Sequence, residues 1–308
     1  YIVTEVQKAD LPMEFVLLPV VESAFDPFAY SSGRASGLWQ FIPSTARLYN
    51  VNIDWWYDGR RDLIDSTNAA TAFLLDLGQT FDEDWLLALA AYNAGPGTVK
   101  KAMRKNRTRQ RTEAFWQLDL PRETKGYIPK LLALAAIVKR PEQYNITLPD
   151  IVPETQIVAF ELDNQIDLAL AAELAEISLE QLYRLNPGFN QWATHPMGPH
   201  RLIIPAKQVE VMAENLALQP QDGQMRWIQH QIRAGETLGG IAQHYDMSVN
   251  ALTQVNHLEG PQIIAGDILI VPTPVNPPLA YGLSSSGRSA KRRQHYETRY
   301  GAPPQNYR

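Results

Sequence analysis

A repeat with a spacing of 70 residues constrains the fold of this 308-residue chain more than any other feature. Residues 154–190 match residues 228–260, and both copies continue into a similar apolar segment, "RLIIP" at 201–205 and "ILIVP" at 268–272. The matched positions carry apolar, helix-capping or amide side chains: Leu168 with Leu238, Ala172 with Ala242, Ser178 with Ser248, Leu182 with Leu252, and Asn186 with Asn256. Each copy therefore predicts a strand, two helices and a second strand, a βααβ plan.

Residues 1–150 predict a different architecture, made mostly of helices. Apolar residues rich in Ala and Leu recur at helical spacing over 66–81, 82–95 and 125–140. Gly95 and Pro96 end the second of these helices, as a glycine cap followed by proline does. The predicted fold class is mainly α, followed by small α+β modules.

The helical pattern and the repeated βααβ pattern also give the expected domain limits. We expect a helical domain over 1–150, a degenerate module over 154–206, a linker over 207–226, a second module over 227–273 and a tail over 274–308. The tail is rich in Pro, then in Ser and Gly, and finally basic, so it predicts disorder, with a truncated third repeat as the alternative.

Composition excludes several classes of protein. The chain is 45% hydrophobic and 20% charged, which is typical of a globular protein. Its net charge is −5 and we expect no block of like charge before residue 270, so nucleic acid is not an expected partner. Cysteine is absent, which excludes disulfides, thiolate catalysis and thiolate metal sites. His195 and His200 lie in an inserted loop and are expected at the surface rather than on a metal ion.

The chain contains no run of about 18 apolar residues that could span a membrane. It opens on "YIVTEVQKAD", without an initiator methionine or a signal peptide. We therefore expect it to be a piece of a longer precursor, with any targeting segment upstream.

One carboxylate, Glu22, stands where its ionised form is disfavoured. It ends the apolar run in "LLPVVESAF" and, in helical phase, shares a face with Phe15 and Leu18. Desolvation raises the pKa of a carboxyl group, and an acid that is still protonated near neutrality can protonate the leaving oxygen of a glycosidic bond. The alternative is a glutamate that turns toward water at a helix end. Asp26 precedes Pro27 and is expected to support the turn.

Three further stretches carry the side chains that a sugar site needs, namely aromatic faces together with amide and hydroxyl groups. They are "GRASGLWQFIPSTA" at 33–46, "AAYNAGPG" at 90–97 and "TKGYIPK" at 124–130. Gly33 and Gly37 mark a loop whose backbone can approach a ligand closely. Each stretch also has a structural interpretation, with Tyr92 in a core, Asn93 as a cap and Trp39 packed inside.

Taken in order, Glu-Ser, Gly-Leu-Trp-Gln-Phe-Ile-Pro-Ser-Thr, Ala-Tyr-Asn-Ala-Gly and a lone Tyr resemble the motifs of the lytic murein transglycosylases of the Slt type, over about residues 8–145. The resemblance implies a helical fold like that of goose-type lysozyme, with Glu22 as the catalytic acid and base. It implies a substrate site made of Ser23, Gly37, Leu38, Trp39, Gln40, Phe41, Tyr92, Asn93, Ala94 and Tyr127. It also implies that Ser23 and Gln40 bind sugar or orient Glu22, and that Tyr127 contacts Glu22 directly.

The two repeats are similar to LysM modules, which bind glycans that contain N-acetylglucosamine. The match is good over 228–272 and implies glycan contacts from Gly235, Glu236, Thr237, Leu238, Asn256 and Ile264. The first copy departs from the pattern. Gln165 replaces the glycine that corresponds to Gly235, and "NQWATHPMGPH" is inserted at 190–200.

The resemblance implies cleavage of the β-1,4 bond between N-acetylmuramic acid and N-acetylglucosamine of peptidoglycan, leaving a 1,6-anhydro end. None of the other three motifs contains Asp or Glu, which suits a reaction with one carboxyl group rather than two. One alternative is a lysozyme-like hydrolase in which Asp54, Asp58 or Asp65 positions a water. Another is a peptidoglycan-binding protein with an inactive domain.

The resemblance also implies the setting of the protein. We expect peptidoglycan glycan strands as the partner, no cofactor, no metal and no nucleic acid, and a monomer. The expected location is the bacterial envelope or periplasm, with any outer-membrane anchor outside this chain.

Overall fold

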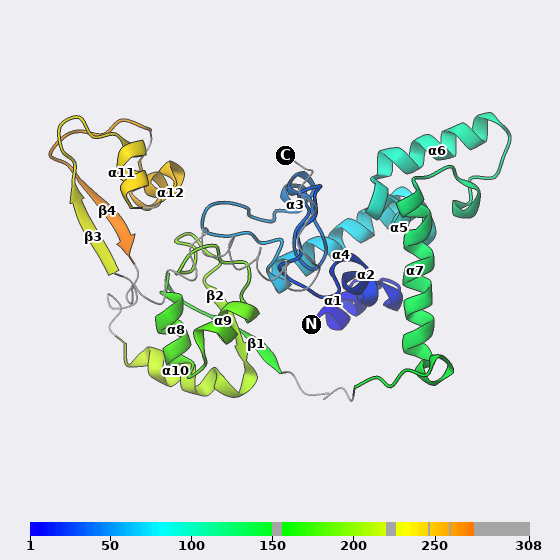
Figure 1. The fold of residues 1–308 in the computed structure, drawn as a ribbon, viewed down its shortest axis with the longest axis horizontal. Helices are drawn as coiled ribbons and strands as arrows, with labels where there is room; N and C mark the ends of the chain where they lie inside the picture. Colours follow the sequence, from blue (N-terminus) through cyan, green and yellow to red (C-terminus); the bar gives the residue numbers. More distant parts are fainter. Residues whose placement is uncertain (150–155, 220–225, 246, 259, 274–308) are drawn as a thin grey trace, which may run out of the picture. The chain divides into compact units, whose positions relative to one another are not determined.

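The computed structural model describes residues 1–149, 156–219, 226–245, 247–258 and 260–273, and it divides the chain into two compact units (Figure 1). Unit 1 comprises Tyr1–Asn52 and Gly59–Pro153, and unit 2 comprises Ile53–Asp58 and Glu154–Arg308. The short segment Ile53–Asp58 thus packs with residues that follow it by more than a hundred positions.

Unit 1 is built from helices, as expected. In chain order they are α1 (Ile2–Lys8), η1 (Met13–Leu17, a 3₁₀ helix), α2 (Leu18–Ser23), α3 (Pro43–Leu48), α4 (Leu63–Thr80), α5 (Trp85–Ala94), α6 (Pro96–Thr108), η2 (Phe115–Gln117), α7 (Arg122–Lys139) and η3 (Pro141–Tyr144). The three long helices predicted from periodicity are α4, α5 and α7. Asp62 and Asp84 begin α4 and α5, and each side chain accepts hydrogen bonds from two backbone N–H groups of the first turn.

Helix α5 occupies the centre of unit 1. It packs against α4, α6 and α7, and α7 in turn packs against α2. Ala88, Ala90 and Ala91 of α5 are fully buried, and their small side chains let the neighbouring helices approach closely. This packing brings α2, which ends at residue 23, next to α7, which begins about 100 residues later.

Unit 2 contains the two repeats, each with the predicted βααβ plan. In the first module β1 (Ile157–Glu161) pairs antiparallel with β2 (Arg201–Pro205), and α8 (Leu168–Leu174) and α9 (Leu179–Leu185) lie between them in the chain. In the second module β3 (Arg226–Gln231) pairs antiparallel with β4 (Ile268–Thr273), with α11 (Leu238–His244) and α12 (Val249–Val255) between them. Two-stranded sheets are too small to be stable alone, so the helices must cover them.

The spacing of 70 residues between equivalent positions is confirmed in detail. Ser178 and Ser248 cap α9 and α12 by accepting a backbone N–H three residues on. Asn186 donates to the carbonyls of Leu182 and Ile203 and accepts from the Ile203 N–H. Asn256 makes the same three bonds to Leu252 and Ile270. In each module one amide side chain, buried in the first module and half-buried in the second, therefore joins the second helix to the last strand.

The expected linker over 207–226 is wrong for most of its length. A 3₁₀ turn, η4 (Ala206–Gln208), leads into α10 (Val209–Ala217), which packs against α8. Met212 is fully buried, and the Asn215 amide donates to the Leu174 carbonyl at 2.9 Å. The helix itself is mostly apolar, and the polar residues that follow it at 219–224 led to the prediction of a linker. The tail over 274–308, with its possible third repeat, lies outside the described residues.

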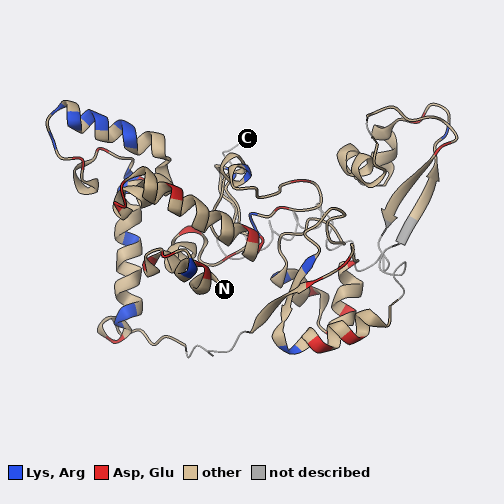
Figure 2. Cartoon of the chain, turned by 180° about the vertical axis from the view of Figure 1, so that it is seen from behind, with Lys and Arg blue, Asp and Glu red and all other residues tan. Residues whose placement is uncertain are grey.

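The absence of like-charge blocks is also wrong. Seven of the twelve residues from 100 to 111 are Lys or Arg and none is acidic, and Figure 2 shows this basic stretch in blue along α6. Arg107 pairs with Glu113 at 2.7 Å and Lys105 with Asp119 at 2.9 Å, both at the surface, where such pairs stabilise a fold only weakly. Among the described residues, none of the helices has the length and apolarity to cross a bilayer.

Candidate active site

The last turn of α2 presents Glu22 at a sharp change of chain direction. Ala24 and Phe25, which follow the helix, have φ angles of 51° and 59°, and such left-handed conformations cost a residue with a Cβ about 1–2 kcal/mol. Asp26 supports this turn as expected, because its Oδ1 accepts the Phe28 N–H at 2.9 Å. The surrounding structure keeps this turn despite its unfavourable φ angles, which indicates that the position of the neighbouring Glu22 carboxyl group is constrained.

Glu22 and Tyr127 form the centre of the site. The Tyr127 hydroxyl, on α7, donates to Glu22 Oε1 at 2.5 Å, which is the contact that the sequence resemblance implied. Burial raises the pKa of Glu22 from 4.5 to about 7, although the hydrogen bond from Tyr127 lowers this pKa. Burial and the charge of Glu22 raise the pKa of Tyr127 well above its usual value. Tyr127 therefore stays protonated and remains a donor.

Glu123 is an acidic residue near Glu22 that the sequence reasoning missed. It is exposed and lies one turn before Tyr127 on α7, and its negative charge raises the pKa of Glu22 further. The signal was present in the four-residue spacing between Glu123 and Tyr127, which places both on one helix face.

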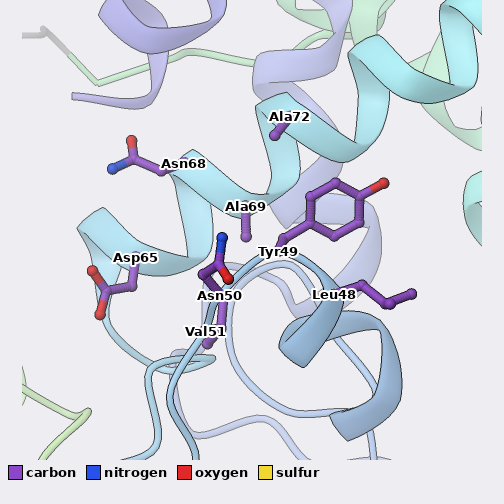
Figure 3. A pocket seen from close by; sticks show the side chains of 8 residues that line it. All are labelled: Leu48, Tyr49, Asn50, Val51, Asp65, Asn68, Ala69 and Ala72. Atoms are coloured by element: carbon purple, nitrogen blue, oxygen red, sulfur yellow. The ribbon is translucent and has the colours of Figure 1, made fainter.

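The acids named in the hydrolase alternative are not among the groups that shift the pKa of Glu22. Asp54 and Asp58 belong to unit 2. Asp65 lines a surface hollow of about 240 Å³ in unit 1, formed by the end of α3 and the first turns of α4 (Figure 3). None of the residues that line this hollow belongs to the predicted sugar site.

Tyr92 and Asn93, at the end of α5, join this helix to the loop over 33–46 and to α7. The Tyr92 hydroxyl donates to the Trp39 carbonyl at 2.8 Å, and burial followed by the charge of Glu22 raises its pKa well above the usual value. Asn93 Oδ1 accepts from the buried hydroxyl of Thr124 at 2.8 Å, which ties α5 to α7. Thr124 is a second residue that the sequence reasoning missed.

The loop over 33–46 is braced from within. Gly37 has a φ of 84°, and a Cβ at this position would lie 1.8 Å from the Arg60 carbonyl oxygen, so only glycine fits. The Gln40 amide donates to the carbonyls of Gly37 and Ala29. The Ser23 hydroxyl lies 2.9 Å from both the Pro19 and the Leu38 carbonyl oxygens. Ser23 and Gln40 thus hold the loop beside Glu22, and their hydrogen bonds go to backbone carbonyls rather than to the Glu22 carboxyl group.

Trp39 and Phe41, which the resemblance assigns to the substrate site, do not present open faces to a sugar in the structure. Both side chains are buried, together with Leu38, and the Trp39 indole donates to the Thr67 hydroxyl at 3.1 Å. Burying a large aromatic ring with its N–H satisfied is favourable, so these residues pack beneath the loop. Ala94, the last residue of α5, is half-buried.

Most residues predicted to bind glycan in the second module also build that module. Gly235 adopts a φ of 88°, Thr237 caps α11 by accepting the Gly240 N–H, and Leu238 is buried. The Asn256 amide is engaged by the backbone as described above. Ile264 is the exception, because 70% of its surface is exposed.

Glu236 takes part in a polar cluster beside β3. Its Oε2 accepts the Arg233 N–H at 2.7 Å and lies 3.0 Å from His230 Nε2, and these two contacts lower the pKa of Glu236. His230 Nδ1 lies 3.1 Å from the Tyr245 hydroxyl. A hollow of about 540 Å³ adjoins this cluster and is lined by residues 229–234 and Tyr245, which the sequence reasoning did not single out.

The expected surface position of His195 is wrong. Only 3% of its surface is exposed, and its Nε2 lies 2.8 Å from Asp54 Oδ2 within unit 2. His200 is half-buried in the same loop. Within the part of the chain that the structure describes, no three His, Asp or Glu side chains are grouped to hold a metal ion.

Comparisons with known proteins agree with this layout. Residues 2–115 match the Transglycosylase SLT domain, residues 156–221 the LysM-like domain of the lytic transglycosylase MltD, and residues 230–272 the LysM domain. Tyr127 lies beyond the first of these matches.

Individual relatives extend the similarity. The chain is 38% identical over 285 residues to membrane-bound lytic murein transglycosylase D of Escherichia coli K12, covering 88% of this chain and 62% of that protein. It is 43% identical over 142 residues to a putative tributyltin chloride resistance protein of Alteromonas, covering 46% of this chain and 68% of that protein. The lytic transglycosylase Slt of Pseudomonas aeruginosa aligns in structure over 47% of this chain and 24% of that chain, with 24% identity and a TM-score of 0.38.

The chain spans about three fifths of the length of the Escherichia coli relative. Its domain matches follow one another in the same order as the helical domain and the two modules of the structure. The chain therefore contains a transglycosylase SLT domain, followed by a LysM-like domain of the MltD kind and a LysM domain.

Proposed function

We propose that the protein is a peptidoglycan lytic transglycosylase that cleaves the β-1,4 bond between N-acetylmuramic acid and N-acetylglucosamine. The observation that carries this proposal is the pair formed by Glu22 and Tyr127. Glu22 has a pKa of about 7 and a hydroxyl donor at 2.5 Å, so near neutrality it can be either protonated or ionised. A group that must first give and then take a proton works best when its pKa lies close to the operating pH.

In the first step Glu22 gives its proton to the glycosidic oxygen, and the bond from that oxygen to C1 of the muramic acid breaks. The N-acetyl group of the same sugar stabilises the positive charge that develops at C1. In the second step the Glu22 carboxylate takes the proton of the C6 hydroxyl, whose oxygen bonds to C1 and closes the 1,6-anhydro ring. Because the nucleophile is part of the substrate, the entropic cost of bringing it to C1 is small.

Tyr127 acts on Glu22 rather than on the sugar in this scheme. Its pKa is raised by burial and by Glu22, so it does not compete as an acid. Its hydrogen bond holds the carboxyl group and favours the ionised form that the second step requires.

A lysozyme-like hydrolase is the second candidate, and the position of Glu123 favours it. A hydrolase needs a second carboxylate that either positions water or attacks C1, about 5–9.5 Å from the acid. Glu123 is exposed and close enough to raise the pKa of Glu22 by its charge. It is therefore a better choice for that second group than Asp54, Asp58 or Asp65.

We further propose that glycan strands of peptidoglycan are bound by the second module as well as by the catalytic site. The exposed Ile264 and the loop over 235–238 supply the glycan contacts in this proposal. The protein then acts as a monomer in the bacterial envelope, in the periplasm or attached to the outer membrane, without a cofactor or nucleic acid. A binding module that is tethered to an enzyme raises the local concentration of an insoluble substrate.

Mass spectrometry of murein digested by the purified chain tests these alternatives together. Anhydro-muramic ends are expected, whereas reducing ends would identify a hydrolase and an undigested sacculus an inactive binding protein. Glu22→Gln should lower the rate by about 100-fold to 10,000-fold, because both proton transfers are lost. Glu142→Gln, at an exposed glutamate, is the matched control. Loss of activity in Glu123→Gln with retention in the Glu22 variant would overturn the assignment of the acid.

A further inference from the structure

The loops that are predicted to bind glycan differ sharply between the two modules. In the second module they are the segment after β3, at 235–238, and the segment after α12, at 256–264. The equivalent segments of the first module are 162–167, after β1, and 186–200, after α9. The second of these contains the insertion, and Gln165 stands in the first where the second module has Gly235.

In the first module these two segments are joined to each other by hydrogen bonds. The Gln165 amide donates to the Thr194 carbonyl at 2.7 Å, and the Ile166 N–H donates to the Thr194 hydroxyl at 3.0 Å. The Thr194 N–H donates back to the Ile166 carbonyl, and the Leu168 N–H donates to the Trp192 carbonyl. Thr194 is fully buried. The polar groups that a glycan would have to reach are therefore already satisfied within the chain.

The segment 186–200, which contains the insertion, also binds the backbone of Ile53–Asp58 in unit 2. Its hydrogen bonds to that backbone include Asn190 Nδ2 to the Asp54 carbonyl at 3.0 Å, Gln191 Nε2 to the Trp55 carbonyl at 2.8 Å, the Asn190 N–H to the Trp56 carbonyl at 2.7 Å, and the Asp58 N–H to the Gly188 carbonyl at 2.8 Å. Hydrogen bonds of this kind recognise the course of a backbone, and side chains add specificity.

Aromatic side chains supply the apolar part of this contact. Trp56 and Tyr57 are fully buried. The Trp56 ring lies 4.8 Å from the ring of Trp55 and 5.9 Å from that of Trp192, and the Tyr57 ring lies 5.2 Å from that of Phe189. Aromatic pairs at these distances stabilise a contact beyond the area that they bury.

His195 adds a side-chain hydrogen bond to the contact between the two segments, and its own contacts define its tautomer. Its Nδ1 accepts the Met197 N–H at 2.9 Å, so in the neutral ring Nε2 carries the hydrogen. Nε2 then donates to Asp54 Oδ2 at 2.8 Å. The Asp54 Oδ1 accepts the N–H groups of Trp56 and Tyr57, so this carboxylate both shapes the segment and anchors it.

We propose that the first module does not bind glycan and instead serves as the docking site for residues 53–58, so that of the two described modules only the second binds glycan. The insertion and the replacement of glycine by Gln165 are the changes that make this possible. The second half of the statement rests on the proposed function, because it assumes that the second module binds glycan. The first half rests on the contacts alone.

Hydrogen exchange of the full chain, followed by mass spectrometry, tests the docking. Trp56→Ala should accelerate exchange in the peptides that cover 157–205 by more than about 100-fold, since removing a buried aromatic ring is among the most destabilising of core changes. Trp116→Ala is the matched control, because 58% of the Trp116 surface is exposed. Asp54→Asn keeps the side-chain size and should give a smaller acceleration, confined to the segments 53–58 and 186–200. Unchanged exchange over 157–205 in Trp56→Ala would overturn the proposal.

The same measurement with an added oligomer of N-acetylglucosamine tests where glycan binds. Protection is expected over 235–238 and 256–264, and Ile264→Asp should remove it. Protection over 162–167 and 186–200 would overturn the proposal. Protection in neither module would refute glycan binding by the second module, which is part of the proposed function, and would leave the docking to be decided by the Trp56 variant.

Discussion

At the scale of single residues, the chemistry of this protein depends on how a glutamic acid is kept in a half-buried position. The pKa of Glu22 is about 7 in the folded chain and 4.5 in its ordinary environment. The folded chain therefore binds the Glu22 proton more tightly than the unfolded chain does. This difference stabilises the fold fully below pH 4.5, and the stabilisation is lost as the pH rises from 4.5 through 7. The rise corresponds to at most about 3 kcal/mol.

Glu22→Gln should therefore change the pH dependence of stability in a defined direction. Near pH 4 the variant and the parent should have similar free energies of unfolding. At pH 8 the variant should be more stable by up to about 3 kcal/mol, since it has no carboxylate to desolvate. Urea unfolding at both pH values measures this difference. Equal stability of the two proteins at pH 8 would mean that the carboxyl group is not desolvated.

Tyr127→Phe separates the orienting role of the hydroxyl from the packing of the ring. Loss of a hydrogen bond to a charged group costs about 1.5–3 kcal/mol, so turnover should fall roughly tenfold to a hundredfold. The hydrogen bond lowers the pKa of Glu22, so its removal should move the alkaline limb of the pH–rate profile upward. Tyr144→Phe, at an exposed tyrosine, is the control. Full turnover with an unmoved profile would remove Tyr127 from the site.

At the scale of elements, the loop beside the acid depends on one glycine. Gly37→Ala would place a methyl group 1.8 Å from the Arg60 carbonyl oxygen and impose an unfavourable φ. It should destabilise unit 1 by about 3 kcal/mol or more, as a strained backbone combined with overpacking does. Gly97→Ala, in α6, meets no atom within 4 Å and should be neutral or stabilising by up to about 1 kcal/mol. Thermal unfolding of both variants makes the comparison.

The elements that the sequence predicts well are those whose signal is local. Helices α4, α5 and α7 follow from apolar periodicity, and the repeat follows from matched caps and apolar positions. Helix α10 escaped although six of its nine residues are apolar, because the polar residues that follow it make the whole segment resemble a linker. The burial of Trp39 could not be foreseen, because the same aromatic residue suits a core and a sugar site equally. The spacing of four residues places Glu123 on the same helix face as Tyr127, but its nearness to Glu22 depends on the packing of α7 against α2, which no local pattern contains.

At the scale of the whole molecule, the course of the chain limits where it can be divided. Residues 53–58 pack within unit 2, which no periodic pattern indicates because 136 residues separate Asp54 from its partner Asn190. A fragment that ends at residue 150 would leave Trp56 and Tyr57 without the groups that bury them. Exposed apolar side chains of this kind favour aggregation.

Two truncations of the chain should therefore behave differently. The fragment 1–221 should stay soluble and cleave soluble glycan strands, but it should lose retention on insoluble sacculi together with the second module. The fragment 1–150 should precipitate or melt at a lower temperature. Size-exclusion chromatography, thermal unfolding and a sacculus sedimentation assay measure these properties. A 1–150 fragment that matches 1–221 in melting temperature would contradict the arrangement of residues 53–58.

The docked segment Ile53–Asp58 has a consequence for folding during synthesis on the ribosome. Asp54 leaves the ribosome 136 residues before Asn190, which binds it in the finished fold. At about 5–20 residues per second, the two tryptophans and the tyrosine of this segment wait on the order of 10 s for their partners. During that interval the aromatic side chains of "DWWYD" are exposed in the nascent chain and can aggregate. Synthesis speed and holding chaperones should therefore influence the yield of this protein more than they influence a chain in which each domain buries its own aromatic residues as it emerges.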